Sequence, residues 1–131
     1  MFLVDTSVWI NLFSKKPAFQ LEAEQLFQLA VSPPIIQELI QGLQTKSSIE
    51  QLKSSILALP CTPSVVNLDD YINAAEIYRA GRRRGLTIRS SVDCLIAALA
   101  IQQGLTVWHL DRDFTAIATY TNLQVTQDPW T

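Results

Sequence analysis

The sequence has few of the residues that build disulfide bonds or zinc sites. It contains two cysteines and one histidine among 131 residues. Both cysteines, Cys61 and Cys94, lie in apolar surroundings, which favours buried free thiols over a disulfide bond. These side chains do not supply the four ligands of a tetrahedral zinc site by themselves. Any metal chemistry is therefore expected from oxygen-bearing side chains.

Long apolar runs and a strong net charge are also absent. No run approaches the roughly 20 apolar residues that span a bilayer. The segment before Asp5 is too short for a signal peptide and lacks its basic leader. We therefore expect a cytoplasmic protein without membrane contact. The net charge of −2 gives no general indication of nucleic-acid binding, so the distribution of charge matters more than its total.

The chain is rich in apolar residues, which make up 48% of it. At this length they suffice for a single domain over residues 1–131 with a core of its own. Half of the ten lysines and arginines fall in one short segment, residues 79–89. The acidic residues are dispersed, but several fall at the ends of expected helices and strands. The sequence therefore indicates one basic flank and one acidic pocket.

The stretch Phe2–Ile10 organises the expected fold. Three apolar residues run directly into Asp5, which is followed by Thr6 and Ser7. A short apolar run bounded by polar residues is typical of a buried strand in a parallel sheet. Asp5 would then lie at the carboxyl end of the strand, where open α/β sheets bind ligands. Thr6 or Ser7 would cap the next helix, and we predict that Asp5 anchors an acidic metal site.

Short helices and strands alternate along the rest of the chain. Helices are expected at residues 8–13, 19–29, 33–43, 47–57, 67–84 and 90–103 and before 118, and strands at 30–32, 105–110 and 123–125. The helix that contains Asp93 is apolar on nearly every side, so we expect it in the core. This alternation predicts an α/β fold with a mainly parallel central sheet of about four or five strands flanked by helices.

Four further acidic residues each have an ordinary explanation when taken alone. Glu38 could face solvent, and Asp93 could interact with the dipole at the start of its helix. Asp111 ends the second clear strand, and Asp113 could cap the helix beside it. Burying several carboxylates together, however, costs much free energy unless a cation compensates them. All-oxygen ligands suit Mg²⁺ or Mn²⁺, whose bound waters suit phosphodiester hydrolysis.

The acidic residues lie in four characteristic stretches of sequence. In chain order these are Val4-Asp5-Thr6-Ser7, Pro34-Ile35-Ile36-Gln37-Glu38-Leu39, Ser91-Val92-Asp93-Cys94-Leu95-Ile96-Ala97-Ala98 and Leu110-Asp111-Arg112-Asp113-Phe114. Together they resemble the four motifs of PIN-domain ribonucleases, and most closely those of the VapC toxins of bacterial and archaeal toxin–antitoxin pairs. The resemblance covers essentially the whole chain.

This resemblance implies a metal-dependent endoribonuclease that hydrolyses RNA. The carboxylates that would hold one or two Mg²⁺ ions, with Mn²⁺ as a substitute, are those of Asp5, Glu38, Asp93 and Asp111. Thr6 or Ser7 would orient a metal-bound water or a phosphate, and Asp113 matches an additional acid that some members use. The resemblance also implies a homodimer and a small antitoxin whose carboxyl-terminal segment reaches the acidic groove.

Two other functions are alternatives to the ribonuclease. A phosphatase of the haloacid dehalogenase type would use Asp5 as its nucleophile, but it needs a second aspartate where Ser7 stands. A non-catalytic receiver-like binding module would need a strand-terminal lysine late in the chain, and the last lysine is Lys53.

The arginine segment has two interpretations. It is either a solvated helix end or a surface that contacts RNA phosphates just upstream of Asp93. The residues concerned are Arg82, Arg83, Arg84 and Arg89.

The single histidine and the tryptophans are expected to be structural. His109 is not needed as a base, because metal-assisted hydrolysis requires none. Trp9, Trp108 and Trp130 suit packing in the core or at a dimer interface more than stacking on bases.

Overall fold

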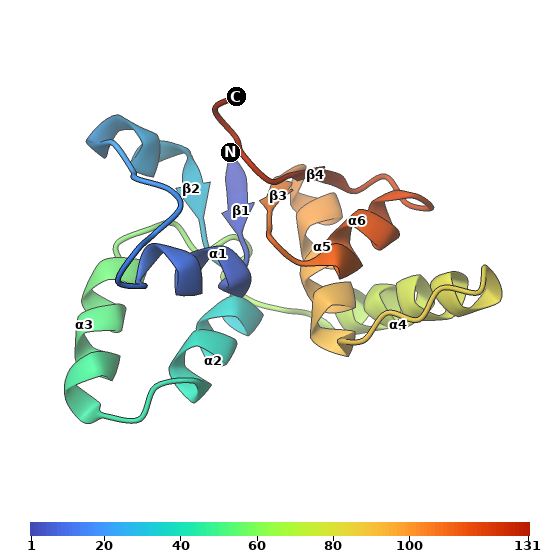
Figure 1. Ribbon diagram of the computed structural model, residues 1–131. Coiled ribbons are helices and arrows are strands. Elements are labelled where there is room, and N and C mark those ends of the chain that lie inside the picture. The colour runs from blue at the N-terminus through green and yellow to red at the C-terminus, as the bar shows by residue number, and fades with distance from the viewer.

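The computed structural model describes all 131 residues around a four-stranded parallel sheet (Figure 1). The strands are β1 (Phe2–Val4), β2 (Leu29–Ala30), β3 (Thr106–Trp108) and β4 (Gln124–Thr126). Their order is β2-β1-β3-β4, and every neighbouring pair is parallel. Directly after β2, Val31 forms an isolated parallel bridge with Cys61, outside the four strands. The expected mainly parallel α/β fold is confirmed.

Helices cover the sheet and extend to both sides of it. They are α1 (Thr6–Leu12), the 3-10 helix η1 (Ala23–Gln28), α2 (Pro33–Gln41), α3 (Lys46–Ile56), α4 (Leu68–Arg83), α5 (Ser91–Gln103) and α6 (Arg112–Ala118). In Figure 1, α1, α2 and α3 lie on the β2 side, whereas α4, α5 and α6 lie on the β3 and β4 side. None of these helices combines the length and the apolar character needed to cross a membrane.

Helix α5 forms the centre of the core, as its apolar sequence predicts. Residues 93–100 are all buried, and α5 packs against α4, α6 and β3. Gly104 ends the helix with a positive φ of 66°, a conformation that glycine adopts without steric cost. The consequence for the site is that Asp93 enters the core on the first turn of a rigid helix.

The expected helix at residues 19–29 is wrong. The structure has only the 3-10 helix η1 here, preceded by an irregular segment from Pro17 to Glu22. Phe19 leaves the helical pattern because its ring packs edge-on against Trp108, with centroids 5.2 Å apart. Tertiary packing therefore overrides the local periodicity, as is common for short segments.

Several element ends differ from the prediction by one to three residues. The expected strand at 105–110 is only β3: the N–H of His109 still donates to the carbonyl of Thr126, but the N–H of Leu110 donates to the hydroxyl of Ser7 and not to a strand. Helix α3 begins one residue before the expected position 47, because Thr45 caps it: the hydroxyl of Thr45 accepts the backbone N–H of Ser48 at 3.1 Å.

The cysteines and tryptophans are largely placed as expected. Both cysteines are free; Cys94 is buried, whereas Cys61 is only half-buried. Trp108 is fully buried, and its ring meets that of Trp130 edge-on at 5.3 Å. Trp9 is also buried and stacks on Phe13.

Candidate metal centre

Asp5 stands at the junction of β1 and α1. Its backbone N–H donates to the carbonyl of Trp108 at 2.9 Å, which extends the pairing of β1 with β3. Its carboxylate is itself the cap of α1 and accepts the backbone N–H of Ser7 at 3.1 Å, so the expected capping by Thr6 or Ser7 is wrong. Burial raises the pKa of Asp5 despite these hydrogen bonds, and the charge of Asp111 raises it further.

The hydroxyl of Ser7 joins the ends of β1 and β3. It donates to Asp5 Oδ2 at 2.6 Å and accepts the backbone N–H of Leu110 at 3.0 Å. Both hydrogen bonds are short enough to fix the rotamer of the serine and one face of the carboxylate. Ser7 therefore holds Asp5 in a set position relative to the loop that carries Asp111.

Glu38 reaches the same place from helix α2. The helix starts at Pro33 directly after β2, so its first turns lie at the carboxyl edge of the sheet. Thr6 donates its hydroxyl to Glu38 Oε1 at 2.9 Å. Burial raises the pKa of Glu38, and the charges of Asp5 and Asp111 add to this effect. Glu38 is thus half-buried beside other acids and does not face open solvent.

Asp111 caps α6 at the end of the loop that follows β3. Its Oδ1 accepts the backbone N–H of Asp113 at 2.9 Å, and its own N–H donates to Nδ1 of His109 at 3.2 Å. His109 is 1% exposed, and burial lowers its pKa, which keeps the ring neutral and Nδ1 free to accept. His109 therefore has the structural role expected of it, and it fixes the backbone of Asp111.

Asp93 is the least compensated acid of the group. It is 4% exposed, and its Oδ2 is buried without any hydrogen-bond partner. Burial, together with the charges of Asp5, Asp111, Asp113 and Glu38, raises its pKa to about 8. A buried carboxylate oxygen without a donor is costly, and a cation is the natural remedy.

The structure brings the five predicted acids into one cluster, with its tightest part at three of them. Ligand oxygens of Asp93, Asp111 and Asp113 lie within 4.8 Å of one another. Asp5 and Glu38 lie outside this trio, but both raise the pKa of Asp93 by their charge. Carboxylate oxygens with no imidazole or thiolate among them suit a hard divalent cation.

The four predicted arginines separate in the structure. Arg82 and Arg84 lie over the rings of Tyr78 and Tyr120, at 5.3 and 5.4 Å from the ring centroids. Among the four, only Arg89 contacts the acids, with guanidinium nitrogens 3.6 Å from Asp111 and 3.7 Å from Asp113.

Comparison with known proteins places this geometry in a family. The PIN-domain model matches residues 2–120. The chain belongs to the PIN-domain family. It is 40% identical to Ribonuclease VapC11 of Mycobacterium tuberculosis, over 95% of this chain and 96% of that protein. At this level of identity it stands among the VapC ribonucleases of the family.

Solved structures of low sequence identity share the PIN-domain fold. FitAcB from Neisseria gonorrhoeae matches with a TM-score of 0.73 at 24% identity, covering 99% of each chain. VapBC-5 from M. tuberculosis, a member of the VapBC family of toxin–antitoxin systems, matches with a TM-score of 0.66 at 21% identity. It covers 96% of this chain and 97% of that one. Family membership favours the ribonuclease over the phosphatase and receiver alternatives.

One polar residue of the PIN domain's sheet edge was not identified from the sequence. Ser32 is fully buried, and its hydroxyl has no partner. Ser32 follows β2 and precedes α2 at the carboxyl edge of the sheet, as Asp5 follows β1 and precedes α1. The available signal was the same as for Asp5, namely a polar residue directly after a buried strand.

Proposed function

We propose that this chain is a Mg²⁺-dependent endoribonuclease and the toxin of a toxin–antitoxin pair. The observation that carries the proposal is the unpartnered Oδ2 of Asp93, buried within the trio it forms with Asp111 and Asp113. The oxygen-only donor set fits Mg²⁺, or Mn²⁺ as a substitute. Similarity to Ribonuclease VapC11 supports RNA as the substrate.

The acids have different proposed roles in binding the metal. Asp5, Asp93 and Asp111 are the proposed direct ligands, and Glu38 contributes directly or through a water molecule. Bound Mg²⁺ would supply an activated water and stabilise negative charge on the phosphate in an in-line displacement. Because Asp93 has a pKa of about 8 without metal, its proton must leave when the ion binds near neutral pH.

The two hydroxyl residues position carboxylates in this scheme. Ser7 donates to Asp5 and Thr6 donates to Glu38, so neither hydroxyl proton is left for a metal-bound water or a phosphate oxygen. We therefore assign both residues to the support of the carboxylates, a role that commonly changes metal affinity by roughly tenfold to a hundredfold.

An antitoxin segment has a suitable groove next to Glu38. A hollow of about 330 Å³ lies among α1, α2 and α3 and is lined by Ile10, Phe13, Leu43 and Glu38. Ile10 and Phe13 are 63% and 54% exposed, which is unusual for large apolar side chains beside such a hollow. An apolar peptide lying there would reach the acidic site, in agreement with the toxin–antitoxin complexes that share this fold.

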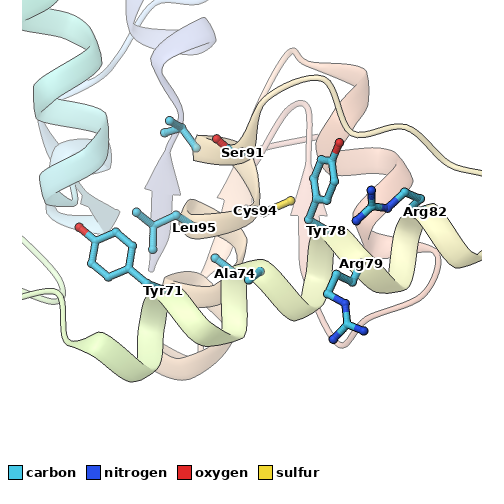
Figure 2. A pocket seen from close by; sticks show the side chains of 10 residues that line it. Tyr71, Ala74, Tyr78, Arg79, Arg82, Ser91, Cys94 and Leu95 are labelled. Carbon is cyan, nitrogen blue, oxygen red and sulfur yellow. The ribbon is translucent and has the colours of Figure 1, made fainter.

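A second copy of the chain is proposed to cover the hollow between α4 and α5 (Figure 2). This hollow has a volume of about 530 Å³, and Tyr71, Tyr78 and Leu95 line it. Tyr71 and its neighbour Ile72 are 54% and 50% exposed in the single chain. Tyr71→Glu is expected to convert a dimer to a monomer in size-exclusion chromatography with light scattering.

RNA cleavage by the purified protein tests the central proposal. We expect internal cleavage with Mg²⁺, none with EDTA, and none for Asp93→Ala. Asp69→Ala, an exposed change on α4, is the matched control and should cleave normally. Undiminished cleavage by Asp93→Ala would falsify the site assignment.

The toxin role needs a separate test in cells. Expression of the chain alone should arrest growth, and co-expression of the product of the neighbouring gene should relieve the arrest. Arrest that persists with Asp93→Ala would contradict the link between the site and toxicity.

A further inference from the structure

Asp113 differs from the other acids in how its carboxylate is used. Its Oδ2 accepts the backbone N–H of Arg89 at 3.0 Å, and its Oδ1 lies 3.7 Å from Nε of the same residue. Both oxygens of a side chain that is 5% exposed therefore face one arginine. Asp93, by contrast, keeps one oxygen without any partner. Asp113 thus has one oxygen hydrogen-bonded to a backbone N–H and the other beside a guanidinium, whereas Oδ2 of Asp93 has no donor.

Arg89 is held by its backbone and free at its guanidinium. The guanidinium lies 3.6 Å from Asp111 and 3.7 Å from Asp113, beyond hydrogen-bond distance, and the side chain is 57% exposed. Such an exposed ion pair contributes little and is easily exchanged for another anion. The hydrogen bond from the backbone N–H to a buried carboxylate is the stronger part of the attachment. The backbone of Arg89 is therefore fixed, while the N–H donors of its guanidinium remain available to another partner.

The surroundings of Arg89 favour a phosphate group as its partner. An open depression of about 450 Å³ at the mouth of the acidic site is lined by Ser7, Arg89, Leu110, Asp111 and Arg112. A guanidinium has five N–H donors in a planar arrangement that matches phosphate oxygens. Arg82 and Arg84 are not equivalent to Arg89, since both lie over tyrosine rings and the ion pairs with Asp111 and Asp113 are those of Arg89.

We propose that Asp113 is a positioning residue and not a metal ligand, and that it fixes Arg89 so that the guanidinium binds a phosphate of the RNA beside the acidic site. This proposal rests on the ribonuclease function proposed above. It also assigns a structural reason to the spacing of Asp111 and Asp113, because the first acid caps α6 and the second holds the loop before α5.

Mn²⁺ binding separates the two aspartates without any need for catalysis. The titration uses the full chain and follows free Mn²⁺ by electron paramagnetic resonance, for Asp93→Asn and Asp113→Asn. We expect Asp93→Asn to weaken Mn²⁺ binding by at least about tenfold, and Asp113→Asn to change it by less than about threefold. Equal losses in both variants would overturn the positioning role, since Asp113 would then be a ligand.

RNA affinity tests the role of Arg89, again without cleavage. Binding of a short fluorescein-labelled oligouridylate is measured by anisotropy in EDTA at several salt concentrations. We expect Arg89→Gln to weaken binding roughly tenfold to a hundredfold, and to reduce the slope of log affinity against log salt by about 0.7. Arg89→Lys should retain most of the slope, and Lys46→Gln, an exposed change on α3, should keep both quantities.

The anchoring by Asp113 gives a further expected result. Asp113→Ala should reproduce the weakened RNA binding of Arg89→Gln, and the double variant should be no weaker than either single one. An unchanged affinity and slope in Arg89→Gln would overturn the phosphate contact. If the wild-type chain binds the oligonucleotide but does not cleave it, the proposed function fails while the assignments of Asp113 and Arg89 stand on their own measurements.

Discussion

Strands β1 and β3 each contribute to two side-chain clusters of opposite character. The aromatic cluster contains Phe2, Trp108, Phe19 and Trp130, in edge-to-face pairs with centroid distances from 5.2 to 6.1 Å. The acidic cluster follows the same strands, beginning at Asp5. Edge-to-face rings stabilise the fold beyond the area they bury, whereas clustered carboxylates destabilise it.

The difference between the clusters shows where this fold gives up stability for chemistry. In the aromatic cluster the indole N–H of Trp108 donates to the carbonyl of Gln127 at 3.2 Å, and the group left without a partner is the neutral N–H of Trp130. In the acidic cluster, Asp93 Oδ2 has no partner and the pKa of Asp93 is raised to about 8. The charged, uncompensated group therefore lies in the acidic cluster, and that site rests on strands held by an apolar core.

The largest expected effect is the removal of the central aromatic ring. Trp108→Ala should lower the free energy of unfolding by about 3–5 kcal/mol, since it deletes a fully buried indole and leaves a cavity. Urea denaturation measures this loss. Trp108→Phe is the conservative comparison and should lose much less free energy of unfolding. A loss below about 1 kcal/mol for Trp108→Ala would contradict the stabilising role of the aromatic cluster.

Neutralising Asp5, the acid at the end of β1, should reduce activity without reducing stability. Asp5→Asn keeps an acceptor for Ser7 but removes a charge that repels Asp93 and Asp111. We expect RNA cleavage to fall by roughly a hundredfold to a thousandfold. The free energy of unfolding in EDTA should be unchanged or higher. Initial cleavage rates and urea denaturation measure both, with Asp69→Asn as the control, and full cleavage by Asp5→Asn with Mg²⁺ would rule out its role as a ligand.

Removing the hydroxyl that supports Asp5 should have a smaller effect. Ser7→Ala deletes the 2.6 Å bond to Asp5 and the 3.0 Å bond from Leu110. We expect Mn²⁺ affinity to fall by roughly tenfold or more. Thr6→Val removes one hydrogen bond to the half-buried Glu38 and should cost less. Isothermal titration with Mn²⁺ compares the two variants, and a greater loss for Thr6→Val would reverse the order proposed here.

The last expected effect is gradual and appears per pH unit, as a pH dependence of stability in the absence of metal. The folded pKa of Asp93 is about 8, against 3.8 as its ordinary value, so the folded state retains a proton that the unfolded state loses. The contribution of Asp93 is therefore fully favourable below about pH 4 and is lost as the pH rises toward 8. We expect the free energy of unfolding in EDTA to fall by at most about 1.4 kcal/mol per pH unit in this window.

Urea denaturation at pH 5, 6, 7 and 8 measures that slope. Asp93→Asn carries no titratable group at this position and should show a flatter dependence. A wild-type stability that rises over the same range would contradict the raised pKa.

Much of the fold follows from local patterns in the chain. The strand before Asp5, the buried α5 and its end at Gly104 are all readable from apolar runs and one glycine. The segment 17–28 is not, because the ring of Phe19 packs on Trp108, which is distant in the sequence. Element ends were also imprecise, since caps such as Thr45 compete with equally suitable neighbours.

The candidate site divides in the same way between sequence and tertiary structure. Asp5, Glu38, Asp93 and Asp111 each have an ordinary explanation alone, and they are proposed as a set from their joint positions and from the family resemblance. Only the folded chain decided that Ser7 bonds to Leu110, that Asp93 keeps one oxygen open and that Arg89 faces Asp113. Those contacts join residues up to 103 positions apart in the sequence. Their geometry depends on the register of the parallel strands. The sequence by itself determined which groups are present, and the packing of β1, β3 and α5 determined which of them are compensated and which still require a cation.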